Sequence, residues 1–135
     1  MRPFRIVIAA HGSLAAAFLG SAEMICGPQE DVVALGLQPH DSPESFADRM
    51  RHAMGGPDVP ALLLTDLQGG TPNNVARLVA RGRSDVAIVA GVNLGIIIEA
   101  VTSLESIDED AIAHLVSTGR DSIVDSTKRL VRDSS

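Results

Sequence analysis

The residues best suited to chemistry in this sequence are His11 and Asp66, because each directly follows a short apolar run. His11 comes after residues 6–10, and Asp66 comes after residues 61–65. A neutral imidazole is a nucleophile, and a carboxylate bonded to one ring nitrogen fixes the tautomer and leaves the other nitrogen free to attack. If the two apolar runs are neighbouring strands, the pair predicts a site that accepts an electrophilic group on His11.

Residues 69–72, Gly-Gly-Thr-Pro, are suited to holding an anion. The glycines let the backbone approach a ligand closely, and Thr-Pro is typical of the cap and first turn of a helix. A helix N-terminus presents free N–H groups and a partial positive charge, which favours phosphate. The candidate phosphate-binding residues are therefore Gly70, Thr71 and Ser13, the last of which begins an earlier helix.

Short apolar runs alternate with helical patterns along the chain. Strands are predicted over residues 6–10, 32–35, 61–65 and 86–90, and helices over 14–26, 42–54, 71–80, 94–103 and 108–118. This alternation predicts a three-layer, doubly wound α/β fold with a mainly parallel sheet and right-handed crossovers. The flavodoxin-like order, with strand 1 beside strand 3, would bring His11 and Asp66 into one crevice at the carboxyl edge. Ile123 and Val124 are the candidates for a short last strand.

Composition narrows the classes of function. The chain has 135 residues, so we expect a single domain over residues 1–135, and its 45% hydrophobic but only 2% aromatic content predicts an aliphatic core that includes Met24 and Cys26. A lone cysteine cannot form an internal disulfide. The net charge of −6, with no long basic run, argues against nucleic acid as a partner. No apolar stretch reaches the roughly 20 residues of a membrane span and no signal peptide opens the chain, so we expect a cytoplasmic protein without membrane insertion.

Other chemistries fit these residues less well. No second carboxylate or P-loop accompanies His11, so the site is expected to need no metal and no cofactor. A nucleotide or flavin module on the same fold would need a glycine-rich loop after strand 1, and residues 11–13 do not supply one. A serine hydrolase would use Ser13, but this residue lies two positions from the histidine without a G-x-S-x-G turn.

Three stretches of the sequence resemble the enzyme IIA component of the mannose-family phosphoenolpyruvate-dependent sugar phosphotransferase system. They are IVIAAHGSLAAAFLGSAEMICG, LLLTDLQGGTPNNVA and AIVAGVNLGIIIEA. The resemblance covers nearly the whole chain in order, and the Asp-x-x-Gly-Gly-Thr-Pro element is its most specific part. The phosphocarrier subunit of the dihydroxyacetone kinase system, which has a related fold, is the alternative, but its motif lacks this element.

The resemblance implies a histidine phosphocarrier. The residue matching His11 takes a phosphoryl group from the histidine phosphocarrier protein and passes it to the enzyme IIB component, which phosphorylates the sugar during transport. The family aspartate that pairs with this histidine matches Asp66, and the hydroxyl beside the phosphate matches Thr71. The family forms homodimers whose last strand is exchanged between subunits, which would be residues 123–124. Leu67-Gln68 stands where relatives often carry an aromatic residue, a difference that concerns partner docking.

Overall fold

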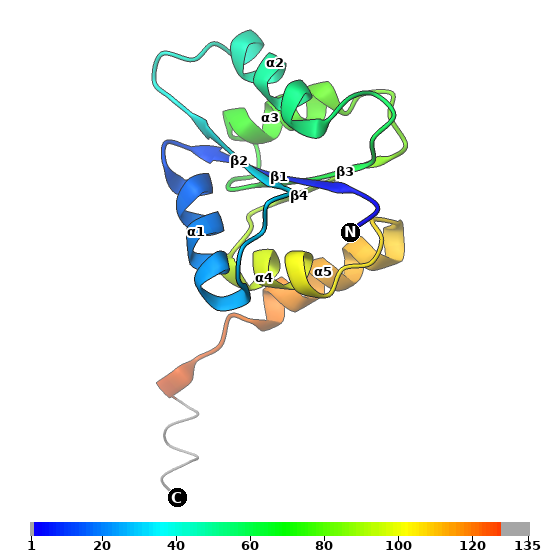
Figure 1. Ribbon diagram of the computed structural model, residues 1–135. Coiled ribbons are helices and arrows are strands. Elements are labelled where there is room, and N and C mark those ends of the chain that lie inside the picture. The colour runs from blue at the N-terminus through cyan, green and yellow to red at the C-terminus, as the bar shows by residue number, and fades with distance from the viewer. Residues whose placement is uncertain (1, 128–135) are drawn as a thin grey trace, which may run out of the picture.

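A computed structural model describes residues 2–127 and shows a parallel sheet between two layers of helices (Figure 1). The four strands are β1 (Arg5–His11), β2 (Val32–Leu37), β3 (Ala61–Thr65) and β4 (Val86–Ala90). They lie in the order β2-β1-β3-β4, and every neighbouring pair is parallel. The predicted α/β fold, with strand 1 beside strand 3, is therefore confirmed.

The helices pack in two groups on the two faces of the sheet, as Figure 1 shows. They are α1 (Leu14–Cys26), α2 (Pro43–Met54), α3 (Thr71–Val79), α4 (Leu94–Thr102) and α5 (Glu109–Asp121). α2 and α3 cover one face, and α1, α4 and α5 cover the other. Each of these helices was predicted, with ends that differ by at most three residues.

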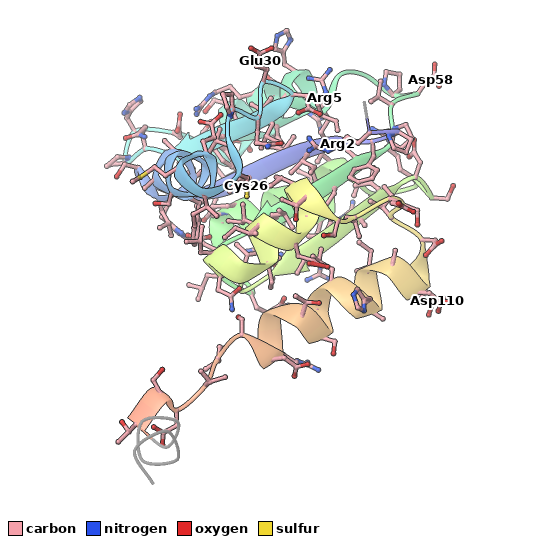
Figure 2. The ribbon with its side chains drawn as sticks, turned by 60° about the horizontal axis from the view of Figure 1, so that its bottom comes forward. Arg2, Arg5, Cys26, Glu30, Asp58 and Asp110 are labelled. Atoms are coloured by element: carbon pink, nitrogen blue, oxygen red, sulfur yellow. The ribbon has the colours of Figure 1, made fainter. Side chains whose placement is uncertain are left out.

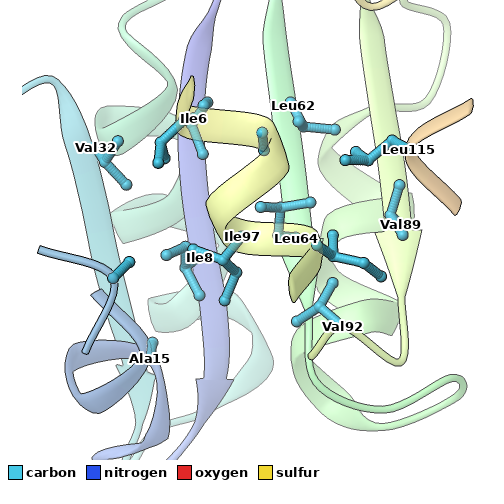
Figure 3. Packing of buried hydrophobic residues seen from close by; sticks show 14 of the residues in the cluster. Ile6, Ile8, Ala15, Val32, Leu62, Leu64, Val89, Val92, Ile97 and Leu115 are labelled. Carbon is cyan, nitrogen blue, oxygen red and sulfur yellow. The ribbon is translucent and has the colours of Figure 1, made fainter. Parts of the chain in front are cut away.

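Both faces of the central strands are buried, which explains why their sequences are continuously apolar. Ile6 and Leu62 face the layer of α1, α4 and α5 (Figure 3), whereas Val7 and Leu63 face the layer of α2 and α3. All four side chains are fully buried. The sheet is thus a rigid base whose carboxyl edge carries the loops after β1, β3 and β4.

Polar side chains fix the starts of several helices. Ser42 Oγ accepts a hydrogen bond from the N–H of Ser45 at 3.0 Å, and Asn93 Oδ1 accepts one from the N–H of Ile96 at 2.9 Å. Asp108 caps α5 in the same way. Since each cap satisfies an N–H that the helix itself leaves free, the sequence specifies where these helices begin.

Two apolar side chains near the end of α1 are exposed, although one of them was expected in the core. Met24 is 88% exposed and Ile25 is 63% exposed, so the prediction that Met24 fills the core is wrong. The reason is that α1 packs one narrow face on the sheet and fully buries only Ala15 and Ala22. Cys26, at the end of α1, is partly buried against the core on this side (Figure 2).

Within this one chain Ile123 and Val124, the candidates for a short last strand, form no strand. After α5 the chain runs away from the sheet (Figure 1), so no strand backbone lies beside these residues. Ile123 is 76% exposed and Val124 is 55% exposed. Among residues 2–127, no helix is long and apolar enough to cross a bilayer.

The packing of α5 on α4 depends on Gly119, which is buried in α5. A Cβ added there would overlap the side chain of Ile96. Gly→Ala in a helix normally stabilises by about 1 kcal/mol, but overpacking a core costs roughly 1–3 kcal/mol. We therefore expect Gly119→Ala to lower the free energy of unfolding by about 1 kcal/mol, measured by urea denaturation.

The matched control is Gly20→Ala in α1, where an added Cβ meets nothing within 4 Å. At this exposed position alanine only adds helix propensity and overlaps no neighbour, so we expect the free energy of unfolding to rise by up to about 1 kcal/mol. Changes of the same sign in the two variants would contradict the packing described for Gly119.

Candidate functional site

The structure brings His11 and Asp66 together at the carboxyl edge of the sheet. His11 is the last residue of β1, and Asp66 directly follows β3, whose last residue, Thr65, is in register with Ala9. His11 Nδ1 lies 2.8 Å from Asp66 Oδ2, and the His11 backbone N–H donates to the same oxygen at 3.0 Å. The expected contact between the carboxylate and one ring nitrogen is therefore present, and it involves Nδ1.

The environment of Asp66 keeps its carboxyl ionised. Burial raises the pKa of Asp66, but the hydrogen bonds from the His11 backbone and ring and the charge of the ring outweigh burial, so the pKa lies below its ordinary value. The side chain of Asp66 is 10% exposed, whereas that of His11 is 48% exposed. A carboxylate that accepts a hydrogen bond from Nδ1–H keeps the proton on Nδ1 and the lone pair on Nε2, so the arrangement favours a nucleophilic Nε2.

Only one oxygen of Asp66 is used in this pair. Oδ2 takes both bonds from His11, and Oδ1 is buried without a hydrogen-bond partner in the described part of the chain. A buried acceptor without a partner reduces stability. The unpaired Oδ1 therefore lowers the free energy of unfolding, and the packing of the core does not explain why the protein keeps it.

The turn after β3 brings the start of α3 beside the imidazole. Gly69 has a φ of +80°, a left-handed conformation, and the Gly70 N–H donates to the Leu67 carbonyl at 3.1 Å. A Cβ at Gly70 would lie only 3.0 Å from His11 Cε1. The backbone at Gly70 can therefore sit against the ring only because the side chain is absent.

Thr71 occupies a different helical position from the one predicted. Gly70 is the N-cap of α3, and Thr71 and Pro72 are its first two helical residues, so the prediction of Thr71 as N-cap is wrong. Pro72 is thus the second helical residue, where its missing N–H is still not needed, because the first N–H groups of a helix have no partner within it. Thr71 still lies in the first turn of α3, close to the candidate site in sequence and space.

Ser13 is the N-cap residue of α1, but its side chain makes no capping hydrogen bond. The preceding Gly12, with a φ of +58°, is held by a hydrogen bond from its N–H to the Leu37 carbonyl at 2.8 Å. A hydrolase using Ser13 would need a bond between its hydroxyl and His11, and none is present within residues 2–127.

Asn73 is not among the site residues predicted from the sequence, yet it is buried beside the site. Asn73 is 2% exposed and Thr65 is 0% exposed, and they are the two buried polar residues in the described structure. The helical pattern of α3 contained the signal, since Asn73 and the buried Ala76 lie three residues apart on one face. A polar residue at such a position requires hydrogen-bond partners inside the protein.

The site lies on an open surface and not in an enclosed cavity. An open cavity of about 490 Å³ is lined by Thr71 and other residues of α3 together with Pro43, but His11 is not among its lining residues. Among residues 2–127, no three His, Cys, Asp or Glu side chains are grouped to hold a metal ion. Fold and site together define an α/β protein with a surface histidine whose ring is oriented by an aspartate.

The comparisons with known proteins place the chain in a family. Residues 5–117 match the family model described as the PTS system fructose IIA component, and the chain belongs to this family. The family predicted from the three sequence stretches is thereby confirmed.

Individual relatives agree with this assignment. The chain is 31% identical over 123 residues to the mannose-specific EIIAB component of Escherichia coli strain K12, covering 87% of this chain but only 38% of that protein. The mannose/sorbose-specific IIA subunit from Enterococcus faecalis has a TM-score of 0.83 and 32% identity, with 93% of this chain and 95% of that chain covered. EIIA from Streptococcus agalactiae also gives a TM-score of 0.83, with 30% identity and coverage of 93% and 98%.

The lowered pKa of Asp66 has a consequence for stability. Because the folded-state pKa lies below the ordinary value of 3.8, Asp66 stabilises the fold above that pH, and the contribution is lost as the pH falls through the folded pKa. We expect Asp66→Asn to show a smaller loss of the free energy of unfolding than the wild type between about pH 6 and about pH 3. Urea denaturation at several pH values measures this difference.

A second variant separates the two bonds to Asp66. In His11→Ala the backbone N–H still reaches Oδ2, whereas the ring is gone. The pH dependence of its stability should therefore lie between those of the wild type and Asp66→Asn. Identical pH dependence in all three proteins would show that the pair does not lower the pKa of Asp66.

Proposed function

We propose that the protein is a histidine phosphocarrier that accepts a phosphoryl group on His11 Nε2 and passes it on during sugar uptake. The donor is the histidine phosphocarrier protein, and the acceptor is the enzyme IIB component. The observation that supports this most directly is the 2.8 Å contact between His11 Nδ1 and Asp66 Oδ2 beside a half-exposed ring. Family membership supports the same class of chemistry.

The proposed transfer uses the two ring nitrogens differently. Asp66 accepts a hydrogen bond from Nδ1–H, and the lone pair of Nε2 attacks the phosphorus of the phosphorylated donor. A new P–N bond forms to His11 while the P–N bond of the donor breaks, and the donor imidazole keeps that electron pair. Attachment at Nε2 places the phosphoryl group away from the Asp66 carboxylate, which limits repulsion between the two anions.

The start of α3 is the proposed binding site for the phosphoryl oxygens. Gly70 lies against the ring, and the N–H groups and the Thr71 hydroxyl of the first turn suit an anion there. The uncommitted hydroxyl of Ser13 is a further donor in the proposal. The proposed site residues include no Lys or Arg, which suits a carrier because the phosphoryl group must leave again.

The direct test is phosphorylation by purified enzyme I, the histidine phosphocarrier protein and phosphoenolpyruvate. We expect intact mass to show one added phosphoryl group on the wild type, labile in acid, and none on His11→Ala. Phosphorus NMR should place the group at Nε2, because Nδ1 is held by Asp66.

Two results would contradict the proposal in different ways. An unlabelled wild type, in the presence of donors that phosphorylate a known family member, would mean that this chain is not a carrier for them. A signal from phosphate on Nδ1 would mean that Asp66 does not fix the ring in the proposed tautomer.

We also propose that the protein is a homodimer in which the segment after α5 reaches a second copy. In the described structure β4 is an edge strand, so its outer backbone groups are open to pairing. Ile123 and Val124 follow α5 as exposed apolar residues, and Met24 and Ile25 add further exposed apolar surface on α1. Exposed apolar side chains of this kind suit an interface where a second copy covers them.

Replacing both Ile123 and Val124 by Asp tests the dimer. The charged side chains should prevent burial of this segment, so we expect light scattering after size exclusion to give a monomer mass, compared with a dimer for the wild type. The control is Leu78→Asp, which changes a residue of α3 that is 44% exposed on the opposite helical layer. A dimer that persists in the double variant would rule out this segment as the contact.

A further inference from the structure

Two consecutive asparagines hold the backbone of Gly69 from both sides. Asn73 Oδ1 accepts a hydrogen bond from the Gly69 N–H at 3.1 Å, and Asn74 Nδ2 donates to the Gly69 carbonyl at 3.1 Å. Gly69 lies in the turn between Asp66 and α3 and has a φ of +80°. The two side chains therefore fix both polar backbone groups of the one residue in this turn that has a left-handed conformation.

The two hydrogen bonds from Asn73 and Asn74 to the Gly69 backbone form a clamp, and this clamp is anchored in the sheet through Asn73. Asn73 Nδ2 donates to Thr65 Oγ1 at 3.2 Å, and Thr65 Oγ1 donates to the Val89 carbonyl of β4 at 3.4 Å. Asn73 and Thr65 are both buried, and each has its partners inside the protein. Because a buried amide is tolerated only when it is hydrogen-bonded, this chain of bonds defines one position for the Asn73 side chain.

The position of Gly69 sets the position of Gly70. Gly70 is the next residue and the N-cap of α3, and it lies so close to His11 Cε1 that an added Cβ would be 3.0 Å away. The contact between His11 and Asp66, in contrast, depends on the ends of β1 and β3. The ring of His11 is therefore oriented by the strand ends, whereas the Gly69-Gly70 turn is held by the two asparagines, of which Asn73 is itself anchored at the end of β3.

We propose that Asn73 and Asn74 are positioning residues that hold the Gly69-Gly70 turn, and with it the first N–H groups of α3, against the ring of His11. The proposal rests on the proposed function, in which these N–H groups bind the phosphoryl oxygens. Neither asparagine reacts, and both act through the Gly69 backbone. Loss of the clamp leaves the nucleophile intact but misplaces the groups that stabilise the phosphoryl group during transfer.

Asn74→Ala is the first test, because Asn74 is exposed and its loss leaves no buried group without a partner. We measure transfer from the phosphorylated histidine phosphocarrier protein in single-turnover experiments over a range of donor concentrations. We expect the maximal rate to fall by about tenfold or more, since small misplacement of binding groups slows reaction steeply. The half-saturating donor concentration and the urea midpoint should change little.

The control is Arg77→Ala, which removes an exposed side chain one turn further along α3. It leaves both bonds to Gly69 in place, so we expect the wild-type maximal rate. NMR of the His11 ring in Asn74→Ala should also match the wild type, because the bond to Asp66 is untouched. A changed ring signal would mean that the variant acts on His11 itself and would overturn the proposed separation.

The buried half of the clamp needs a pair of variants. Asn73→Leu leaves the Gly69 N–H without its partner and removes the donor to Thr65 Oγ1, which keeps only its bond to the Val89 carbonyl, so this variant should be less stable as well as slower in transfer. Adding Thr65→Val removes the hydroxyl whose acceptor capacity is no longer used, at the loss of its long bond to the Val89 carbonyl, and should restore part of the stability, because replacing both partners of a buried bond is less costly than replacing one. Gly69 remains unheld in this double variant, so transfer should stay slow.

The outcomes separate the two proposals. If the wild type accepts no phosphoryl group, the proposed function fails and the positioning proposal fails with it. If the wild type is phosphorylated and Asn74→Ala has the same maximal rate, only the positioning proposal fails. Recovery of transfer together with stability in Thr65→Val/Asn73→Leu would likewise show that Asn73 serves the fold alone.

Discussion

The pairing of β1 with β3 is the constraint on which the rest of the structure depends. His11 and Asp66 are 55 residues apart in the chain, and the parallel register of these strands brings their side chains to 2.8 Å. If one of these strands slipped by one residue against the other, its side chains would turn to the other face of the sheet, and His11 and Asp66 would separate. Full burial of both strands on both faces prevents such a slip, so the hydrophobic core also sets the geometry of the site.

The site combines two requirements that the fold meets with different means. Orientation of the imidazole is fixed by strand ends and a largely buried carboxylate, and one oxygen of Asp66 has no hydrogen-bond partner within residues 2–127. In the proposed function a phosphoryl group reaches the ring beside a glycine turn, and this turn has to be held because glycine has no conformational preference of its own. The bonds from Asn73 and Asn74 to Gly69 meet that second requirement.

Much of the fold could be predicted from local patterns, because buried parallel strands and capped helices leave strong signals in sequence. The bounds of β3, β4 and α1 coincide with the predicted ranges, and the strand order follows from the alternation. The pairing of His11 with Asp66 followed from that order. The burial of Asn73 and the exposure of Met24 could not be predicted in this way, because both depend on how far each helix face is covered by its neighbours. A propensity or a helical period states which residues share a face, but tertiary packing decides how much of that face is buried.

The half-exposed position of His11 also follows from the proposed chemistry. A phosphoryl group that moves between proteins must be reached by two different partners, so its carrier residue cannot lie in a closed pocket. An exposed imidazole, however, has no defined tautomer unless something fixes one nitrogen. The structure reconciles these demands by burying Asp66 while leaving nearly half of the His11 side chain exposed. The carboxyl edge of a doubly wound sheet suits this arrangement, because the sheet holds the backbone of a residue that ends a strand while its side chain can reach solvent.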